Sequence, residues 1–278
     1  MNLFGHQKNF HSIIRKISWR IGRKVYTWSR HDQINRPEVN GEYALLKSFL
    51  KKKSEGVLLF DIGANKGEWS IKALEVSKQL GINIQIHLFE PAADSFTRLK
   101  RIMLDTHVHL NKVALSDQKG ITNLFVRGEV CGINSLYGDG GGNPEEVDSI
   151  TFDDYLAKVG VPEMVIVKSD TEGHDFKVIQ GATVALKLGK VSVWQFEYNH
   201  RWIEARNYLK DVFDFILDKP YWVGKLSSNG VEIYREWHPE LERFFEGNYV
   251  LIHKDLAIDR NICEISMFNY SNVPTKFI

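Results

Sequence analysis

The stretch Val57-Leu-Leu-Phe-Asp-Ile-Gly-Ala-Asn-Lys-Gly67 decides the fold of this 278-residue chain. It begins with a short apolar run, which is typical of a strand buried on both faces of a parallel sheet. A turn with glycines at Gly63 and Gly67 follows, and the segment from Glu68 has helical periodicity. This order favours nucleotide binding, because backbone N–H groups and the helix dipole then point at the ligand.

The glycine spacing narrows the class of ligand. A dinucleotide fingerprint is Gly-x-Gly-x-x-Gly, in which the second glycine lets the backbone approach a pyrophosphate. Asn65 stands at that second position, and no Gly-Lys-Ser/Thr of a Walker loop follows. The turn therefore favours a nucleoside ligand without a pyrophosphate, such as S-adenosylmethionine (SAM).

The chain beyond this turn alternates strands and helices, which predicts a Rossmann-like, doubly wound α/β fold. A seven-stranded sheet is expected, with strands at residues 57–61, 82–89, 108–115, 164–168, 191–196, 221–226 and 249–252. A helix over residues 172–188 is expected to break at Gly181. The nucleotide-binding domain then covers residues 56–256, between a helical extension (1–55) and a polar C-terminal tail (257–278) whose pattern indicates little.

Acidic residues end four of these strands: Asp61, Glu90, Asp170 and Glu197. In an open α/β sheet the ligand lies outside the carboxyl ends of the strands, so we expect the four to converge there. Glu90 follows Gly67 at about the spacing of an acid that binds ribose hydroxyls, although an acid at a helix start is the alternative. Asp61 is expected to receive the ammonium of SAM, directly or through water, unless it only bonds local backbone.

Six motifs, in this order, resemble those of the FkbM-type methyltransferases. They are Asp61-Ile-Gly-Ala-Asn-Lys-Gly67, Phe89-Glu-Pro91, Val113-Ala-Leu-Ser-Asp117, Thr151-Phe-Asp-Asp-Tyr-Leu156, Lys168-Ser-Asp-Thr-Glu-Gly173 and Gln195-Phe-Glu197. The resemblance covers residues 57–200 and departs slightly from the Lys-Ile-Asp form of the family at Ser169. It implies a class I SAM-dependent methyltransferase fold and, usually, O-methylation of a hydroxyl on a sugar, a glycolipid or a secondary metabolite.

The resemblance also implies roles for individual residues. The residues that would hold SAM are Asp61, Gly63, Ala64, Asn65, Gly67, Glu90, Pro91 and Ala114, the last in the turn expected near adenine. Asp170, Glu172 and Glu197 would line the acceptor side. A divalent metal held by these three acids is left open, because magnesium prefers oxygen ligands, but no metal site is predicted.

A sugar hydroxyl is a poor nucleophile at neutral pH and needs a base within hydrogen-bond reach. His174 and His200 follow Asp170 and Glu197 closely and are the candidate bases, while Asp170 is expected to orient either histidine or to take the proton itself. The alternatives are an exposed helix residue for His174 and a loop residue beside Trp202 for His200. A non-catalytic nucleotide-binding module that recruits a partner, and methylation of an amine or carboxylate, also stay open.

The N-terminal extension has an unusual charge. Residues 1–31 contain seven basic and no acidic residues, although the net charge of the whole chain is only +1, which suggests no general affinity for nucleic acid. Apolar residues recur there at helical steps, at Phe10, Ile14, Ile17, Ile21, Val25 and Trp28. Such a helix either lies on an anionic membrane or packs on this protein's own core or a sister subunit.

No apolar run in this extension is long enough for a signal peptide or a membrane span. Cys131 and Cys263 are the only cysteines, and they form no metal spacing or disulfide framework. We therefore expect a reduced, cytoplasmic setting, with peripheral contact at the inner face of the membrane as the additional possibility that the N-terminal helix raises.

Overall fold

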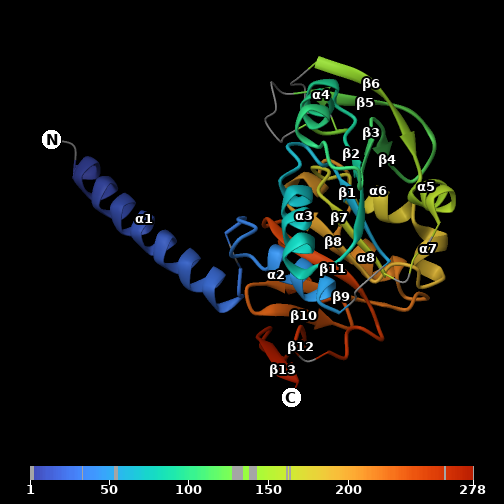
Figure 1. Ribbon diagram of the computed structural model, residues 1–278. Helices are drawn as coiled ribbons and strands as arrows, with labels where there is room; N and C mark the ends of the chain where they lie inside the picture. Colours follow the sequence, from blue (N-terminus) through green and yellow to red (C-terminus); the bar gives the residue numbers. More distant parts are fainter. Residues whose placement is uncertain are drawn as a thin grey trace.

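The computed structural model describes residues 3–32, 34–52, 56–126, 134–137, 143–160, 162, 164–259 and 261–277 (Figure 1). Most of the glycine-rich loop expected at residues 138–144, and Cys131, lie outside these ranges. The helices are α1 (Leu3–Ser29), α2 (Glu42–Leu50), α3 (Glu68–Leu80), α4 (Ala93–Ile102), α5 (Phe152–Val159), α6 (Asp175–Gln180), α7 (Thr183–Lys187) and α8 (Leu209–Phe215), with short 3-10 helices η1 (His200–Trp202) and η2 (Pro239–Leu241).

Thirteen strands are described, and they form two sheets. The strands are β1 (Val57–Ile62), β2 (Ile84–Phe89), β3 (Val108–Asn111), β4 (Ala114–Leu115), β5 (Gly120–Val126), β6 (Asn143–Ile150), β7 (Met164–Ser169), β8 (Val193–Tyr198), β9 (Tyr221–Ser227), β10 (Gly230–Tyr234), β11 (Gly247–His253), β12 (Cys263–Phe268) and β13 (Pro274–Phe277). The main sheet has the order β13-β12-β10-β9-β11-β8-β7-β1-β2-β3.

The seven strands predicted from the sequence form one continuous part of this sheet, from β3 to β9, and the predicted α/β fold is confirmed. Strands β3, β2, β1, β7 and β8 are parallel, and β11 is antiparallel to both of its neighbours. The strand expected at residues 108–115 divides after Asn111, and its last residues join the second sheet as β4.

Helices cover both faces of the main sheet, as a doubly wound fold requires. In β1, Leu58 and Phe60 pack into the core that includes α5 to α8, whereas Val57 and Leu59 pack into the core that includes α2, α3 and α4. Figure 1 shows α3 on one side of the sheet and α5 to α7 on the other. Since each fully buried side chain of this size contributes about 1.5–3 kcal/mol, β1 is anchored firmly from both sides.

Three more strands widen the sheet beyond the predicted seven. β10 pairs with β9 in a hairpin, and the polar C-terminal tail adds β12, parallel to β10, and then β13. The tail offers few alternating apolar residues, and only Cys263 and Ser266 of β12 are buried. Backbone hydrogen bonds to an existing strand edge, rather than a hydrophobic pattern, therefore order this tail.

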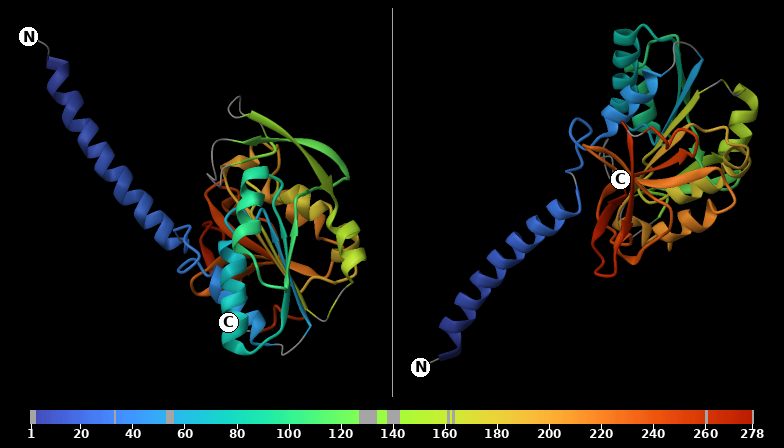
Figure 2. Two further views of the ribbon diagram at one scale, coloured as in Figure 1. Left: turned by 45° about the horizontal axis from the view of Figure 1, so that its top comes forward. Right: turned by 90° about the horizontal axis from the view of Figure 1, so that it is seen from below.

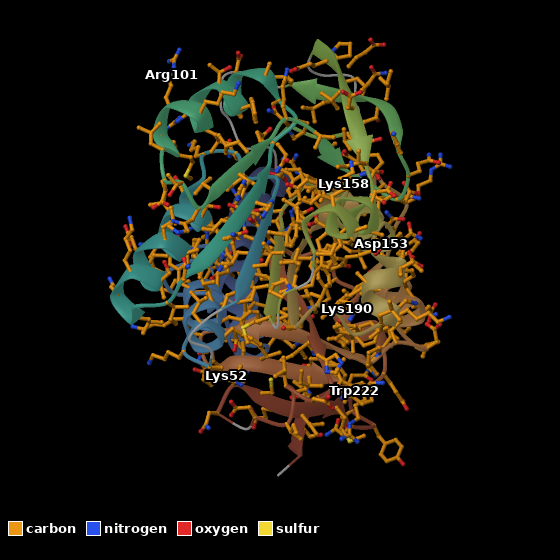
Figure 3. The ribbon with its side chains drawn as sticks, turned by 45° about the vertical axis from the view of Figure 1, so that its right-hand side comes forward. Lys52, Arg101, Asp153, Lys158, Lys190 and Trp222 are labelled. Atoms are coloured by element: carbon orange, nitrogen blue, oxygen red, sulfur yellow. The ribbon has the colours of Figure 1, made fainter. Side chains whose placement is uncertain are left out.

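The second sheet has the order β4-β6-β5, and Ala114 and Leu124 of this sheet share a cavity wall with Ile62 and Phe89, the last residues of β1 and β2. Leu124 and Val147 of this sheet pack with Ala92 at the start of α4. On the neighbouring helical face, Asp153 of α5 accepts hydrogen bonds from the backbone N–H groups of Val184 and Ala185, both at 2.8 Å, which fixes α7 beside α5 (Figure 3). The predicted break at Gly181 is confirmed, because α6 ends at Gln180 and α7 begins at Thr183.

Helix α1 projects away from this body and touches it only near its C-terminal end (Figure 2). Among the described residues, no helix is both long enough and apolar enough to cross a membrane.

Candidate functional site

The predicted glycine turn connects β1 to α3 and has left-handed backbone at three residues. The φ angles are 79° at Gly63, 45° at Asn65 and 74° at Gly67, which is the N-cap of α3. At Gly63 an added Cβ would lie 2.1 Å from the backbone oxygen of Asp170, so no larger residue fits between the ends of β1 and β7. The backbone N–H groups of Gly63 and Ala64 both donate to the carbonyl of Phe89, which ties the turn to β2.

Glu90, directly after β2, bridges the glycine turn and the start of α4. One carboxylate oxygen accepts from the N–H of Asn65 at 2.8 Å and the other from the N–H of Ala92 at 2.9 Å. Burial raises the pKa of Glu90 to about 7, despite these two hydrogen bonds. The carboxylate thus holds the glycine turn against the start of α4, and its role in binding ribose stays a prediction.

Asp61 lies beneath the turn. Its Oδ2 accepts from Ser70 Oγ of α3 at 2.6 Å, whereas its Oδ1 is buried and has no hydrogen-bond partner among the described residues. Burial raises the pKa of Asp61, although the positive charge of Lys168 opposes this shift. An unpaired buried carboxylate oxygen fits the predicted role of Asp61 as acceptor for the ammonium of SAM, because such an oxygen is costly without a donor.

A cavity of about 100 Å³ opens at the carboxyl ends of β1, β2 and β7. The predicted cofactor residues in its wall are Gly63, Asn65, Glu90, Pro91 and Ala114. Asp61, Ala64 and Gly67 do not line this cavity, and the side chains of Asp61 and Ala64 are buried. Of the predicted acceptor and catalytic residues, Asp170, Glu172 and His174 share the same cavity wall, whereas Glu197 and His200 do not.

Asp170 and Glu172, directly after β7, and Glu197 in β8 form a partly buried acidic group. Burial and the nearby Asp170 raise the pKa of Glu172 to about 8, although Arg201 Nε lies 3.1 Å from its Oε2. Glu172 also has a left-handed φ of 55°, an uncommon conformation for a residue with a side chain. The loop after β7 is thus strained where it lines the cavity, which is typical of a functional site.

Glu197 is buried, whereas Asp170 and Glu172 are partly exposed. Its carboxylate accepts from Asn199 Nδ2 at 2.7 Å and from Asn35 Nδ2 at 3.3 Å. Burial, together with the negative charges of Asp170 and Glu172, raises its pKa well above the ordinary value. Lys168 neutralises part of the group, since its Nζ lies 3.2 Å from Asp170 Oδ2.

The two candidate bases differ in their surroundings. His174 is buried with both ring nitrogens engaged: Nε2 lies 3.0 Å from Ser116 Oγ and Nδ1 lies 2.9 Å from Tyr137 OH. Burial lowers the pKa of His174 to about 4, so its imidazole is neutral at neutral pH. His200 is exposed in η1, outside the cavity wall.

Several residues of the site lie outside the six sequence motifs that resemble those of the FkbM-type methyltransferases. Tyr137 contacts His174, and Ser135 Oγ donates to the backbone oxygen of Glu172 at 3.0 Å, so the segment 134–137 closes one side of the cavity. Asn35 reaches Glu197 from the N-terminal extension. Neither segment has a pattern that indicates this role, because each contributes single polar contacts across long sequence separations. No group of three or more His, Cys, Asp or Glu in the described ranges is arranged to hold a metal ion.

Comparisons with known proteins identify the type of domain. Residues 61–223 match the model of the methyltransferase FkbM domain. Solved structures with a similar fold include a SAM-dependent methyltransferase from Agrobacterium tumefaciens (6% identity, TM-score 0.41, covering 76% of this chain and 60% of that one). A putative caffeoyl-CoA O-methyltransferase from Staphylococcus aureus is also similar (11% identity, TM-score 0.39, covering 89% of this chain and 99% of that one). No curated protein matches the chain.

Proposed function

The chain belongs to the FkbM methyltransferase family and is a SAM-dependent methyltransferase, and we propose that it methylates a hydroxyl of a sugar or glycolipid. When bound, SAM supplies a methyl group on a positively charged sulfur, and transfer requires the acceptor oxygen in line with that carbon. The residues present fit this cofactor, because Glu90 lies in the cavity wall, and Asp61, which is buried outside that wall, has one carboxylate oxygen with no donor among the described residues.

The observation that carries the proposal is the acidic group beside the cofactor cavity, formed by Asp170, Glu172 and Glu197. Carboxylates accept hydrogen bonds from several hydroxyls at once, which suits a sugar. The negative charge of Asp170, which raises the pKa of both Glu172 and Glu197, also disfavours an acceptor that is itself a carboxylate or phosphate. An amine acceptor is the second candidate, because a cation would be attracted to this group.

We assign the removal of the acceptor proton to Asp170. Asp170 lines the cavity, and its Oδ2 forms an ion pair with Lys168 Nζ at 3.2 Å. His174 already uses both ring nitrogens, and His200 is outside the cavity wall, so neither histidine offers an open acceptor at the cavity. His174 would instead hold Ser116, on the side expected for adenine.

Asp170→Asn tests this assignment, because it keeps the size of the side chain and removes its charge. Turnover, measured as S-adenosylhomocysteine released with a pool of carbohydrates, should fall by about 10²–10⁴-fold, the usual contribution of a general base. SAM affinity, measured by calorimetry, should change far less. Glu75→Gln is the matched control, because Glu75 is exposed on α3, where it forms an ion pair with Lys72.

Other outcomes would redirect the proposal. A loss of activity that only follows a loss of SAM affinity would assign Asp170 to the cofactor site. Product formed with amines but not with carbohydrates would favour the second candidate. SAM binding without transfer to any acceptor class would favour a non-catalytic module. His174→Ala and His200→Ala should keep turnover within about tenfold, so a loss of about 10²-fold or more would return the base role to that histidine.

A further inference from the structure

The apolar stripe of α1 is uncovered in the structure. Its described side chains are Ile13, Ile14, Ile17, Ile21, Val25 and Trp28, and their exposed fractions run from 45% for Ile14 to 79% for Trp28. The alternative that this stripe packs on the protein's own core is therefore wrong for these residues. A contiguous exposed apolar surface of this kind is typical of an interaction site.

The face of α1 that does touch the body is a different one. The Tyr26 ring lies edge-on to Phe245 with centroids 6.5 Å apart, and Arg23 Cζ lies 5.2 Å from the Phe245 ring centre. At about 100° per residue, Tyr26 and Arg23 lie roughly on the opposite side of the helix from Ile17, Ile21 and Trp28. Docking through this face leaves the stripe directed away from the protein.

The base of α1 is held firmly. Asp32 pairs with Lys225 and with Arg243, whose Nη2 lies 2.7 Å from Asp32 Oδ1, and all three side chains are largely buried. Arg30 Nη2 donates to the backbone oxygen of Glu240 at 2.8 Å. Figure 2 shows the helix extending outward from this anchor in both views. The stripe is thus presented at a fixed position rather than on a loose tail.

The basic side chains of α1 indicate which kind of partner the apolar stripe binds. The flanking side chains include Lys16, Arg20 and Lys24, and residues 1–31 contain no Asp or Glu. A second copy of α1 packed on the stripe would bring like charges together with no acid to pair them. An anionic lipid surface instead favours each basic residue by about fivefold in binding.

We propose that α1 lies in the headgroup layer of an anionic bilayer, with the Ile13–Trp28 stripe toward the acyl chains. The helix binds the surface and does not span it, in agreement with the absence of any spanning helix among the described residues. Asn35, a short way beyond the anchor, contacts Glu197. If the proposed function holds, this connection suits an acceptor anchored in the same bilayer.

Flotation with vesicles tests the proposal without any need for activity. The full chain should float with phosphatidylcholine vesicles that contain phosphatidylglycerol and remain behind with phosphatidylcholine alone. Raising the salt from about 0.1 M to about 1 M should release it, because the screening length falls to about 3 Å. Equal binding to neutral vesicles, or none to anionic ones, overturns the proposal.

Two matched variants test which face of α1 meets the lipid. Ile17→Asp and Trp19→Asp each replace an exposed apolar side chain by an aspartate and so introduce the same negative charge. Ile17 lies in the stripe, whereas Trp19 lies on the opposite face of the helix. Ile17→Asp should weaken vesicle binding at least about tenfold more than Trp19→Asp. Equal losses contradict the orientation. Light scattering tests whether the stripe binds a second copy of the chain instead. A full chain that is a dimer, does not bind vesicles and becomes a monomer on Ile17→Asp would assign the stripe to that second copy. Unchanged melting temperatures verify that both variants fold.

Discussion

The carboxylate of Glu90 has both a structural role and a predicted role in binding SAM. It accepts hydrogen bonds from the backbone of Asn65 and Ala92, and it lies in the wall of the cavity that we propose as the SAM site. Because burial raises its pKa to about 7, a large share of the molecules carry a neutral Glu90 at neutral pH before any ligand binds. Hydroxyl donors and the positive sulfur of SAM both favour the charged form.

SAM affinity should therefore depend on pH through Glu90. Below pH 7 binding must remove a proton from Glu90, so the affinity rises with pH, by up to about tenfold per unit, and levels off above the pKa of the free protein. Calorimetry across this range measures the slope. Glu90→Gln keeps the size and one oxygen acceptor and should flatten the slope, whereas Glu90→Ala should weaken SAM by about 1–3 kcal/mol. An unchanged slope in Glu90→Gln would show that another group titrates.

At the scale of elements, the sequence predicts those strands, turns and helices that have a recognisable pattern within a few residues. β1 and the glycine turn were predictable because a buried strand, a positive-φ turn and a helix start each leave a signature within a few residues. β12 and β13 were not, because hydrogen bonding to an existing edge needs no particular side chain. The contacts of Tyr137 with His174 and of Asn35 with Glu197 were also missed, because single polar pairs between residues far apart in the sequence leave no periodic pattern.

The glycine turn allows a prediction with an internal control. Gly63 and Gly81 both have left-handed backbone, with φ of 79° and 67°, but only Gly63 has an atom, the Asp170 oxygen, in the place of a Cβ. Gly81→Ala should cost only the backbone strain, about 1–2 kcal/mol of unfolding free energy. Gly63→Ala should cost about 1–3 kcal/mol more and weaken SAM, because β1 and β7 must separate. Urea unfolding compares the two, and equal losses would contradict the close approach.

At the scale of the whole molecule, the buried acids make folding depend on pH. Burial raises the pKa of Glu90 to about 7 and of Glu172 to about 8, and that of Glu197 well above its ordinary value. In the unfolded chain these groups titrate near their ordinary value of about 4.3. Between the two values the folded protein binds more protons, so its unfolding free energy falls as pH rises.

Buried histidines act in the opposite direction, but over a lower range. Burial lowers the pKa of His87 and His174 to about 4, so the unfolded state binds more protons only below about pH 6.5. Below about pH 6.5 the buried acids and the buried histidines change the unfolding free energy in opposite directions. Between about pH 6.5 and 8 only the buried acids change it. Stability of the ligand-free protein should therefore be highest in mildly acidic solution.

Urea unfolding should accordingly give a free energy about 2–4 kcal/mol lower at pH 8 than at pH 6.5, since each acid that stays protonated over a full pH unit contributes about 1.36 kcal/mol. Glu172→Gln should remove part of this slope, because an amide is neutral at both pH values and can still accept from Arg201. SAM brings positive charge to the same region, so its stabilising effect should be larger at pH 8 than at pH 6.5. A protein whose stability does not fall across this range would show that the acids are ionised in the folded state, and that Glu90 and Glu197 are better solvated than their burial indicates.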